Sequence, residues 1–370
     1  MTERSVDRRF LADSLRAMLE HGRSLDRRSQ GDYWHAITTR LLKQIDSFQG
    51  DAFYSSELSY ASAFSGSPYN SMADLGRELQ AAPWSLAAKK IENCLARVAG
   101  RSRWLDFTWR LVLPRVRTMH HAQQAEANYA ALVHYGFALF RREIESLDVR
   151  SPSCYGPDLV SVERRELAFT TIRNLNILLR IKDVVGPSRD TVVEIGAGAG
   201  ELARIMLASG FCRRCIIVDI PPALAFSQCL LASAFPEARL GFFDPRRGPI
   251  ADDGTLVHFL TPDQIGDIPA FDLGVNVASF GEMSRAIVSG YIGALKAAGF
   301  KDFVSINQRL KKTGNTAAIG ESEYAAWFGP EYRIAARSGW HSDRPVLTLP
   351  TDTPGQPGYQ LLHFTRNQPE

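Results

Sequence analysis

The sequence predicts an α/β protein: a doubly wound, mostly parallel sheet preceded by an all-helical N-terminal domain. Three observations lead to this class. The segment Val192–Ile195, β-branched except for Glu194, is followed by glycines at positions 196, 198 and 200. Beyond it, strand and helix patterns alternate to the end of the chain, which is typical of a parallel sheet. Before residue 150, apolar residues recur only at helical spacing.

The helical N-terminal domain is expected to span residues 1–150. Its first helix is marked by apolar residues between Phe10 and Leu19, and further helices are predicted up to Leu147. Aromatic residues such as Trp34 and Phe48 make these stripes more apolar than one helical layer hides internally. We therefore expect a symmetric homodimer through these helices.

Residues 151–187 are predicted to form a linker and a helix that leads into the sheet, starting near Val160, and residues 188–370 a ligand-binding domain. The expected sheet has seven strands, with the two short patterns at 240–243 and 256–260 counted as one, and it ends in an antiparallel hairpin. The strand patterns cover residues 191–195, 215–218, 240–243, 256–260, 271–276, 301–307, 332–336 and 359–365.

The glycine-rich turn and the end of the second strand predict a cofactor site. Gly196, Gly198 and Gly200 lack a Cβ, so the backbone there can approach a ligand closely. Asp219 ends the second strand, where a carboxylate accepts both hydroxyls of a ribose, and Ile220 follows it into the same site.

The charges around the turn indicate which cofactor it is. A dinucleotide needs a helix N-terminus for its pyrophosphate, but Glu201 stands where that helix begins and Glu194 precedes the turn. Both acids would repel phosphates and would suit an ammonium and a sulfonium. The pattern therefore favours S-adenosylmethionine, the alternative being a turn that binds no ligand.

The segment after the fourth strand carries the candidate catalytic residues. Asn276 ends the strand and is expected to reach the donor or the acceptor, and Glu282 to project into the mouth of the pocket. Phe280 and Met283 would form apolar walls. Alternatively, Ser279 and Glu282 fit a helix capping box.

His341, which follows Gly339 and Trp340 between the last two predicted strands, is a candidate general base. His258 lies within a predicted core strand and is expected to be structural. Cys212 and Cys215 have the spacing of half a zinc site, but no second pair of ligands follows at zinc-site spacing. We therefore predict no metal.

Four segments together resemble the family of sugar O-methyltransferases from antibiotic and surface-polysaccharide gene clusters. The resemblance covers about residues 155–307 and implies S-adenosylmethionine, a class I methyltransferase sheet of the Rossmann-like type, and a small polar acceptor from natural-product biosynthesis. The chain is also similar to free-arginine N-methyltransferases of streptozocin-type biosynthesis. The matching segments are Val193–Arg204, Val218–Pro221, Phe271–Asn276 and Ser279–Met283.

The acceptor stays open between a sugar hydroxyl and a guanidine such as free L-arginine. A hydroxyl needs a general base, often with a divalent metal, but Asn276 and Asn307 stand where metal-dependent relatives carry acids. A guanidinium needs carboxylates, a role that suits Glu282. We expect the N-terminal helices to cover this acceptor pocket. A non-catalytic scaffold that only binds the cofactor is the alternative from another class.

Composition restricts the partners and the compartment. The net charge is +3 with acids and bases interspersed, so no basic stripe indicates nucleic acid. Neither a signal-peptide core nor a membrane-spanning run is present in the sequence. The five cysteines, an odd number, are typical of a reducing compartment, and we expect a cytoplasmic protein.

Overall fold

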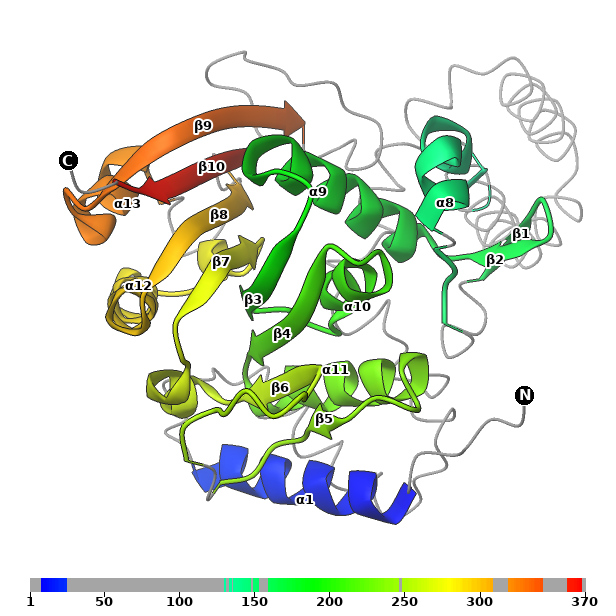
Figure 1. Cartoon of the computed structure of the whole chain (residues 1–370), viewed down its shortest axis with the longest axis horizontal. Coiled ribbons are helices and arrows are strands. Elements are labelled where there is room, and N and C mark those ends of the chain that lie inside the picture. The colour runs from blue at the N-terminus through cyan, green and yellow to red at the C-terminus, as the bar shows by residue number, and fades with distance from the viewer. Residues whose placement is uncertain are drawn as a thin grey trace, which may run out of the picture.

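The computed structural model describes residues 8–24, 130, 133–134, 136–147, 149–152, 159–245, 248–308, 319–341 and 358–367. Their main element is an eight-stranded sheet, with helices on both of its faces (Figure 1). Its strands are β3 (Arg189–Ile195), β4 (Cys212–Val218), β5 (Leu240–Gly241), β6 (Val257–Leu260), β7 (Phe271–Val277), β8 (Phe300–Gln308), β9 (Tyr332–His341) and β10 (Gly358–Arg366).

The strand order is β5-β6-β4-β3-β7-β8-β10-β9. All pairings from β5 to β8 are parallel, and β10 pairs antiparallel with both β8 and β9. The expected α/β class, with a mostly parallel sheet closed by an antiparallel hairpin, is confirmed. The expected count of seven strands is wrong, because the short β5 and β6 pair as two separate strands.

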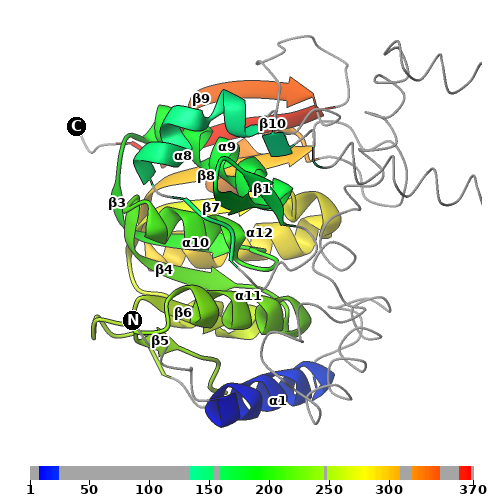
Figure 2. The same cartoon turned by 90° about the vertical axis from the view of Figure 1, so that its right-hand side faces the viewer.

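Helices cover the two faces of the sheet. Figures 1 and 2 show α9, α10 and α11 side by side on one face, with α12 and α13 on the other. A short turn of 3-10 helix, η2, packs against α12. The bounds are α9 (Phe169–Val185), α10 (Glu201–Ala208), α11 (Pro221–Ala234), η2 (Pro262–Asp267), α12 (Arg285–Ala298) and α13 (Glu321–Phe328).

Two hydrophobic clusters fill the space between the sheet and these layers. Successive side chains of a strand point to opposite faces, so Val192 belongs to the cluster under α9–α11 and Val193 to the cluster under α12 and α13. The second cluster is rich in aromatic rings; Phe328, for example, stacks on Phe364 with ring centroids 4.1 Å apart. Burial on both faces explains the continuous apolar runs of the parallel strands.

The first helix of the predicted N-terminal domain packs directly on the sheet domain. α1 (Arg8–Ser24) contacts α11, and its Leu15, Met18 and Leu19 belong to the cluster under α9–α11. The buried Gln228 of α11 accepts a hydrogen bond from Ser14 Oγ at 3.3 Å. Figure 1 shows α1 beyond β5, along the edge of the sheet.

The helix predicted to begin near Val160 begins later. A hairpin, β1 (Val160–Val162) and β2 (Arg165–Leu167), occupies its first two turns, and α9 starts at Phe169. The hairpin turns through Glu163 and Arg164, whose φ angles are 45° and 69°. Positive φ is uncommon for residues other than glycine, and neither Glu163 nor Arg164 is a residue typical of turns. The sequence pattern therefore did not predict this turn.

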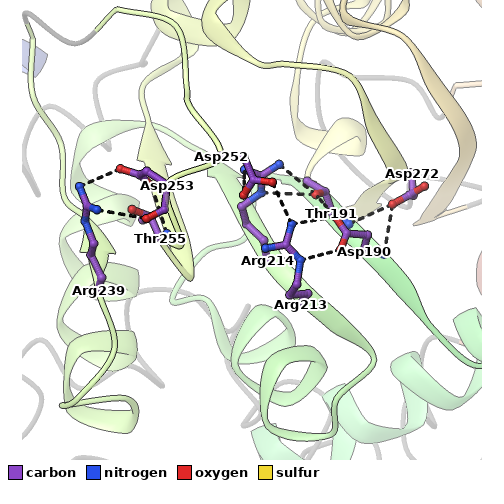
Figure 3. A network of polar contacts seen from close by, with 9 residues as sticks. All are labelled: Asp190, Thr191, Arg213, Arg214, Arg239, Asp252, Asp253, Thr255 and Asp272. Atoms are coloured by element: carbon purple, nitrogen blue, oxygen red, sulfur yellow. Dashed lines mark hydrogen bonds and ion pairs between the residues drawn. The ribbon is translucent and has the colours of Figure 1, made fainter.

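A polar network covers the amino ends of the parallel strands (Figure 3). Arg213 of β4 binds Asp190 of β3 with Nε–Oδ1 at 2.6 Å, and Asp272 of β7 accepts backbone hydrogen bonds at 3.1 Å from β3. Nearby, Asp302 of β8 binds both Arg189 Nη2 at 3.0 Å and His363 Nε2 at 2.8 Å. This edge of the sheet is therefore cross-linked by ion pairs.

Some expectations fall on residues that the structure does not describe. The aromatic positions Trp34 and Phe48, most of the predicted N-terminal helices and the dimer that depends on them are among these, and they stay predictions. The helix α8 (Arg141–Leu147) lies at the end of the predicted N-terminal domain. Within the described residues, no helix is long and apolar enough to cross a membrane.

Candidate cofactor and active site

The glycine turn lies between β3 and α10, at the carboxyl edge of the sheet. Gly196, Gly198 and Gly200 all have positive φ, at 72°, 59° and 80°. A Cβ on Gly196 would lie 2.0 Å from Ser279 Oγ, and one on Gly200 would lie 3.0 Å from the Cβ of Ser227 in α11. These two glycines thus allow the turn to pack against Ser279 and Ser227, whether or not a ligand also approaches the turn.

Asp219 directly follows β4 and faces the same turn. Its Oδ2 accepts a hydrogen bond from Gly198 N at 2.8 Å, and its Oδ1 accepts one from Ile220 N at 2.7 Å. A carboxylate oxygen can accept two hydrogen bonds, so each oxygen of Asp219 can accept one more from a ligand. Burial raises the pKa of Asp219 to about 7, despite the two backbone hydrogen bonds, and the charge of Glu282 contributes to the increase.

Glu194 lies in β3, just before the turn, and is 2% exposed. Its Oε2 is buried without a hydrogen-bond partner among the described residues. Burial and the nearby charge of Asp219 raise the pKa of Glu194 to about 8, although a hydrogen bond from the Ala203 N–H opposes the shift. An orphaned buried carboxylate oxygen is costly, and a ligand that donates to it would remove that cost.

Glu201 does not face a ligand in the way that we expected. Its carboxylate is 1% exposed and is held within the protein by Arg204, with Oε2–Nε at 2.6 Å and Oε1–Nη2 at 2.8 Å. Thr171 Oγ1 of α9 also donates to Oε1 at 2.6 Å. The interpretation of Glu201 as a charge presented to the cofactor is therefore wrong; it ties α9 to the start of α10.

Asn276, near the end of β7, is completely buried and its amide is used within the protein. Its Nδ2 donates to Ile195 O at 2.8 Å and also contacts Ser279 Oγ. Its Oδ1 accepts from Phe280 N at 3.3 Å and from Asn307 Nδ2 at 2.8 Å. Asn276 thus joins the glycine turn to the following loop, and its contact with a donor stays a prediction.

The loop after β7 contains η3 (Phe280–Glu282), a turn of 3-10 helix. Ser279 makes no side-chain capping bond, and its Oγ donates to Ile195 O at 3.2 Å. The next helix, α12, is capped by Ser284, whose Oγ accepts from Ile287 N at 3.4 Å. The capping-box alternative for Ser279 and Glu282 is therefore wrong.

Two neighbours of Ser279 have different surroundings. Phe280 is fully buried in the aromatic cluster under α12, next to Tyr291, Phe303 and Tyr324, so it is not a wall of an open pocket. Glu282 is exposed, and its charge is close enough to Asp219 to raise the pKa of that carboxyl group. The structure thus brings Glu194, Asp219 and Glu282 together at the carboxyl edge of the sheet.

His341 is the last residue of β9 rather than part of the connecting loop, because the final hairpin is longer than predicted. It pairs with Gly358 of β10, at the same edge of the sheet as the glycine turn. Three strand spacings separate β9 from β7 in the sheet, about 14 Å at ~4.8 Å per strand. His341 thus lies at the correct edge but away from the three carboxylates, and its role as a base stays a prediction.

Cys212, Cys215 and His258 are buried within strands, which confirms the structural role expected of His258 and makes the two cysteines part of the core. Within the described part of the chain there is no group of three or more histidine, cysteine or acidic side chains that could hold a metal ion. The residue that sequence reasoning missed is Asn307 of β8. It was considered only as a position without a metal ligand, yet it binds the loop that carries Glu282.

Comparisons with known proteins give only remote likenesses. No family model and no curated protein matches the chain. Among solved structures, magnesium protoporphyrin IX methyltransferase from Synechocystis PCC 6803 with bound SAM is 15% identical, with a TM-score of 0.33 over 53% of this chain and 78% of that one. The N-methyltransferase NodS from Bradyrhizobium japonicum WM9 with S-adenosylhomocysteine is 14% identical, with a TM-score of 0.36 over 54% and 88%.

The tRNA methyltransferase TrmK from B. subtilis is 11% identical, with a TM-score of 0.34 over 51% of this chain and 65% of that one. Two of the three names give an acceptor, magnesium protoporphyrin IX and a tRNA, and these acceptors differ. Likenesses of this size carry no argument about activity, so the function has to be inferred from the site itself.

Proposed function

We propose that the protein is an S-adenosylmethionine-dependent methyltransferase that acts on a small polar acceptor. The observation that carries this proposal is the pair of buried carboxylates, Glu194 and Asp219, on either side of the glycine turn. Neither has an ion-pair partner among the described residues, and each retains an oxygen that can accept further hydrogen bonds. A ligand with hydroxyl and ammonium donors supplies what both carboxylates lack.

The residues present fit this cofactor. Asp219, at the end of β4, would accept the ribose hydroxyls while the N–H groups of Gly198 and Ile220 hold its carboxylate in place. Glu194, with its orphaned Oε2, would accept from the ammonium group. A pyrophosphate would instead place further negative charge beside two acids that already resist ionisation. When bound, the cofactor supplies an electrophilic methyl group on a sulfonium.

Glu282 is the residue that we assign to the acceptor. It is exposed, it does not cap a helix, and its charge acts on the same carboxylate that would hold the donor. A guanidinium or ammonium acceptor would pair with Glu282, which would orient the nitrogen and take up the proton that it loses. For a sugar hydroxyl, the acceptor that the family resemblance implies, Glu282 would serve as the base.

The test is release of S-adenosylhomocysteine from S-adenosylmethionine, measured with pooled sugars, with L-arginine and with simple amines in separate reactions. We expect turnover with one of these classes and none without an acceptor. Turnover only with the sugars would reject the nitrogen acceptor. Tight donor binding without turnover on any class would favour the non-catalytic scaffold, and absence of donor binding would overturn the proposal.

A further inference from the structure

Asn307 lies near the end of β8, beside the loop that carries Glu282. It is 8% exposed, and its amide oxygen accepts a hydrogen bond from Gly281 N at 3.2 Å. Its Nδ2 donates to Asn276 Oδ1 and to Ser305 Oγ, both at 2.8 Å. One buried amide thus contacts the loop, the end of β7 and the interior of the sheet.

The contacts of Asn307 fix the loop on both sides of Phe280. Asn276, which Asn307 holds, accepts from Phe280 N, and Asn307 itself accepts from Gly281 N. Glu282 is the next residue, and its N–H donates to Ser279 O at 3.0 Å. The loop also starts with Ala278 at a φ of 63°, a conformation that costs energy and persists only where neighbours enforce it.

We propose that Asn307 is a positioning residue, which sets the place of Glu282 relative to Asp219 through Gly281 and Asn276. This inference rests on the proposed function, because it concerns the carboxylates assigned there to donor and acceptor. Asn307 itself does not have to touch either ligand. A purely structural amide at this place would stabilise the fold without influencing the electrostatics of the donor site.

The influence of Glu282 on Asp219 can be measured as the pH midpoint of donor-site binding, which a change in stability alone does not shift. Charged and titratable groups face Asp219 from three elements: Glu194 on β3, Glu282 on η3 and Tyr291 on α12. Glu282 disfavours ionisation of Asp219 only while the loop holds it close. If Asn307 holds the loop, its removal must lower the pH midpoint of donor-site binding, as neutralisation of Glu282 does.

The experiment measures S-adenosylhomocysteine affinity by calorimetry from pH 5.5 to 8.5. The variants are Asn307→Ala, Glu282→Gln and the double variant, with Asn307→Ser in case alanine does not fold. The matched control is Tyr324→Phe, which removes the hydroxyl that accepts from Ser305 Oγ at 3.1 Å, at the far end of the same network. The control loses a comparable buried hydrogen bond but does not touch the loop.

We expect both single variants to lower the midpoint by roughly half a pH unit, and the double variant to lower it no further. Tyr324→Phe should leave the midpoint unchanged even if its melting temperature falls as much. A midpoint in Asn307→Ala equal to that of the wild type, or additive shifts in the double variant, would overturn the inference. Failure of the wild-type protein to bind S-adenosylhomocysteine would instead overturn the proposed function itself.

Discussion

At the amino ends of the strands, Asp190, Asp272 and Asp302 each lie beside a cation, whereas at the carboxyl ends Glu194 and Asp219 lie beside each other. The hydrogen bond from Arg213 lowers the pKa of Asp190. At the other edge, burial raises the pKa of Glu194 to about 8 and that of Asp219 to about 7. The same side-chain type is thus stabilised in its charged form at one edge and destabilised at the other.

This difference separates acids whose partners lie within the protein from acids that, under the proposed function, bind a ligand. Figure 3 shows Asp190 bound by Arg213 and Asp272 bound by backbone donors of β3. Asp272 also pairs with Lys301, so these acids need nothing from outside the protein. The carboxyl-end acids are costly in their ionised forms unless a ligand pairs with them. Substitutions at the amino ends should therefore change the free energy of unfolding. Substitutions at the carboxyl ends should change donor binding or turnover.

The largest effect is expected at the amino ends. Asp302→Ala should lower the free energy of unfolding by about 3 kcal/mol, because it leaves Arg189 and His363 partly buried without their anion. Donor affinity should not change. Urea denaturation measures the loss, with Glu237→Ala, whose side chain is exposed, as a control within about 0.5 kcal/mol of wild type.

The effect of Asp302→Ala on stability should depend on pH, because the pKa of Asp302 is lowered in the folded protein. Burial of Asp302 opposes its ionisation, but hydrogen bonds from His363 and Thr365 and the nearby positive charges outweigh it and hold its pKa below the ordinary value. The stabilisation is complete above ~3.9 and is lost as the pH falls through the lowered pKa. The difference between wild type and Asp302→Ala should shrink on acidification, and a constant difference would contradict the assignment.

At the carboxyl ends, Glu282→Gln should lower turnover by roughly two orders of magnitude and leave the melting temperature unchanged. The amide keeps the size of the side chain but loses the charge that would hold a cationic acceptor. Steady-state kinetics with the acceptor identified by the release assay measure this effect. Glu237→Gln, also exposed, is the control. Normal turnover of Glu282→Gln would remove the carboxylate from the mechanism.

Asp219→Ala should weaken donor binding by roughly 1.5–3 kcal/mol, the usual contribution of hydrogen bonds to a charged group. Calorimetry with S-adenosylmethionine measures it, and circular dichroism checks that the protein is folded. Asp302→Ala, at the other edge, should bind the donor normally. Equal affinity of Asp219→Ala and wild type would exclude Asp219 from the donor site and remove the contrast between the edges.

The smallest effect is the proton linkage of donor binding. The folded protein without ligand retains protons on Glu194 and Asp219 that the unfolded chain loses above ~4, so these two groups lower its stability as pH rises from about 4 to 8. A cationic donor favours their ionised forms and releases protons. Affinity should therefore rise toward pH 8, by up to ~1.4 kcal/mol per pH unit for each proton released.

Calorimetry in buffers of different ionisation enthalpy counts the protons released. Glu194→Gln should reduce the count, whereas a change at the amino ends, such as Asp302→Ala, should leave it alone. Affinity that does not depend on pH between 6 and 8 would show that donor binding does not change the protonation state of either acid. In that case donor binding would not distinguish the acids of the two edges.

The sequence predicted the architecture better than the roles of single residues. Strand runs such as Cys215–Val218 are apolar because they are buried on both faces, a property that a sequence displays directly. The hairpin at Glu163 was missed because its turn residues carry no usual turn signal. Glu201 and Phe280 were misinterpreted because a sequence shows a charge or a ring but not its partners, Arg204 for the first and the cluster under α12 for the second. Asn307 acquires a role only when β7 and β8 lie side by side.

The docking of α1 on α11 has a consequence for how the protein is made. Ser14 and Gln228, which meet in this contact, are 214 residues apart in the chain. At about 5–20 residues per second, a ribosome needs roughly 10–40 seconds to synthesise that interval. During this time the apolar face of the first helix, with Leu15, Met18 and Leu19, has been made but its partner has not. The apolar face of α1 must therefore be shielded, by chaperones or by transient contacts, until α11 emerges.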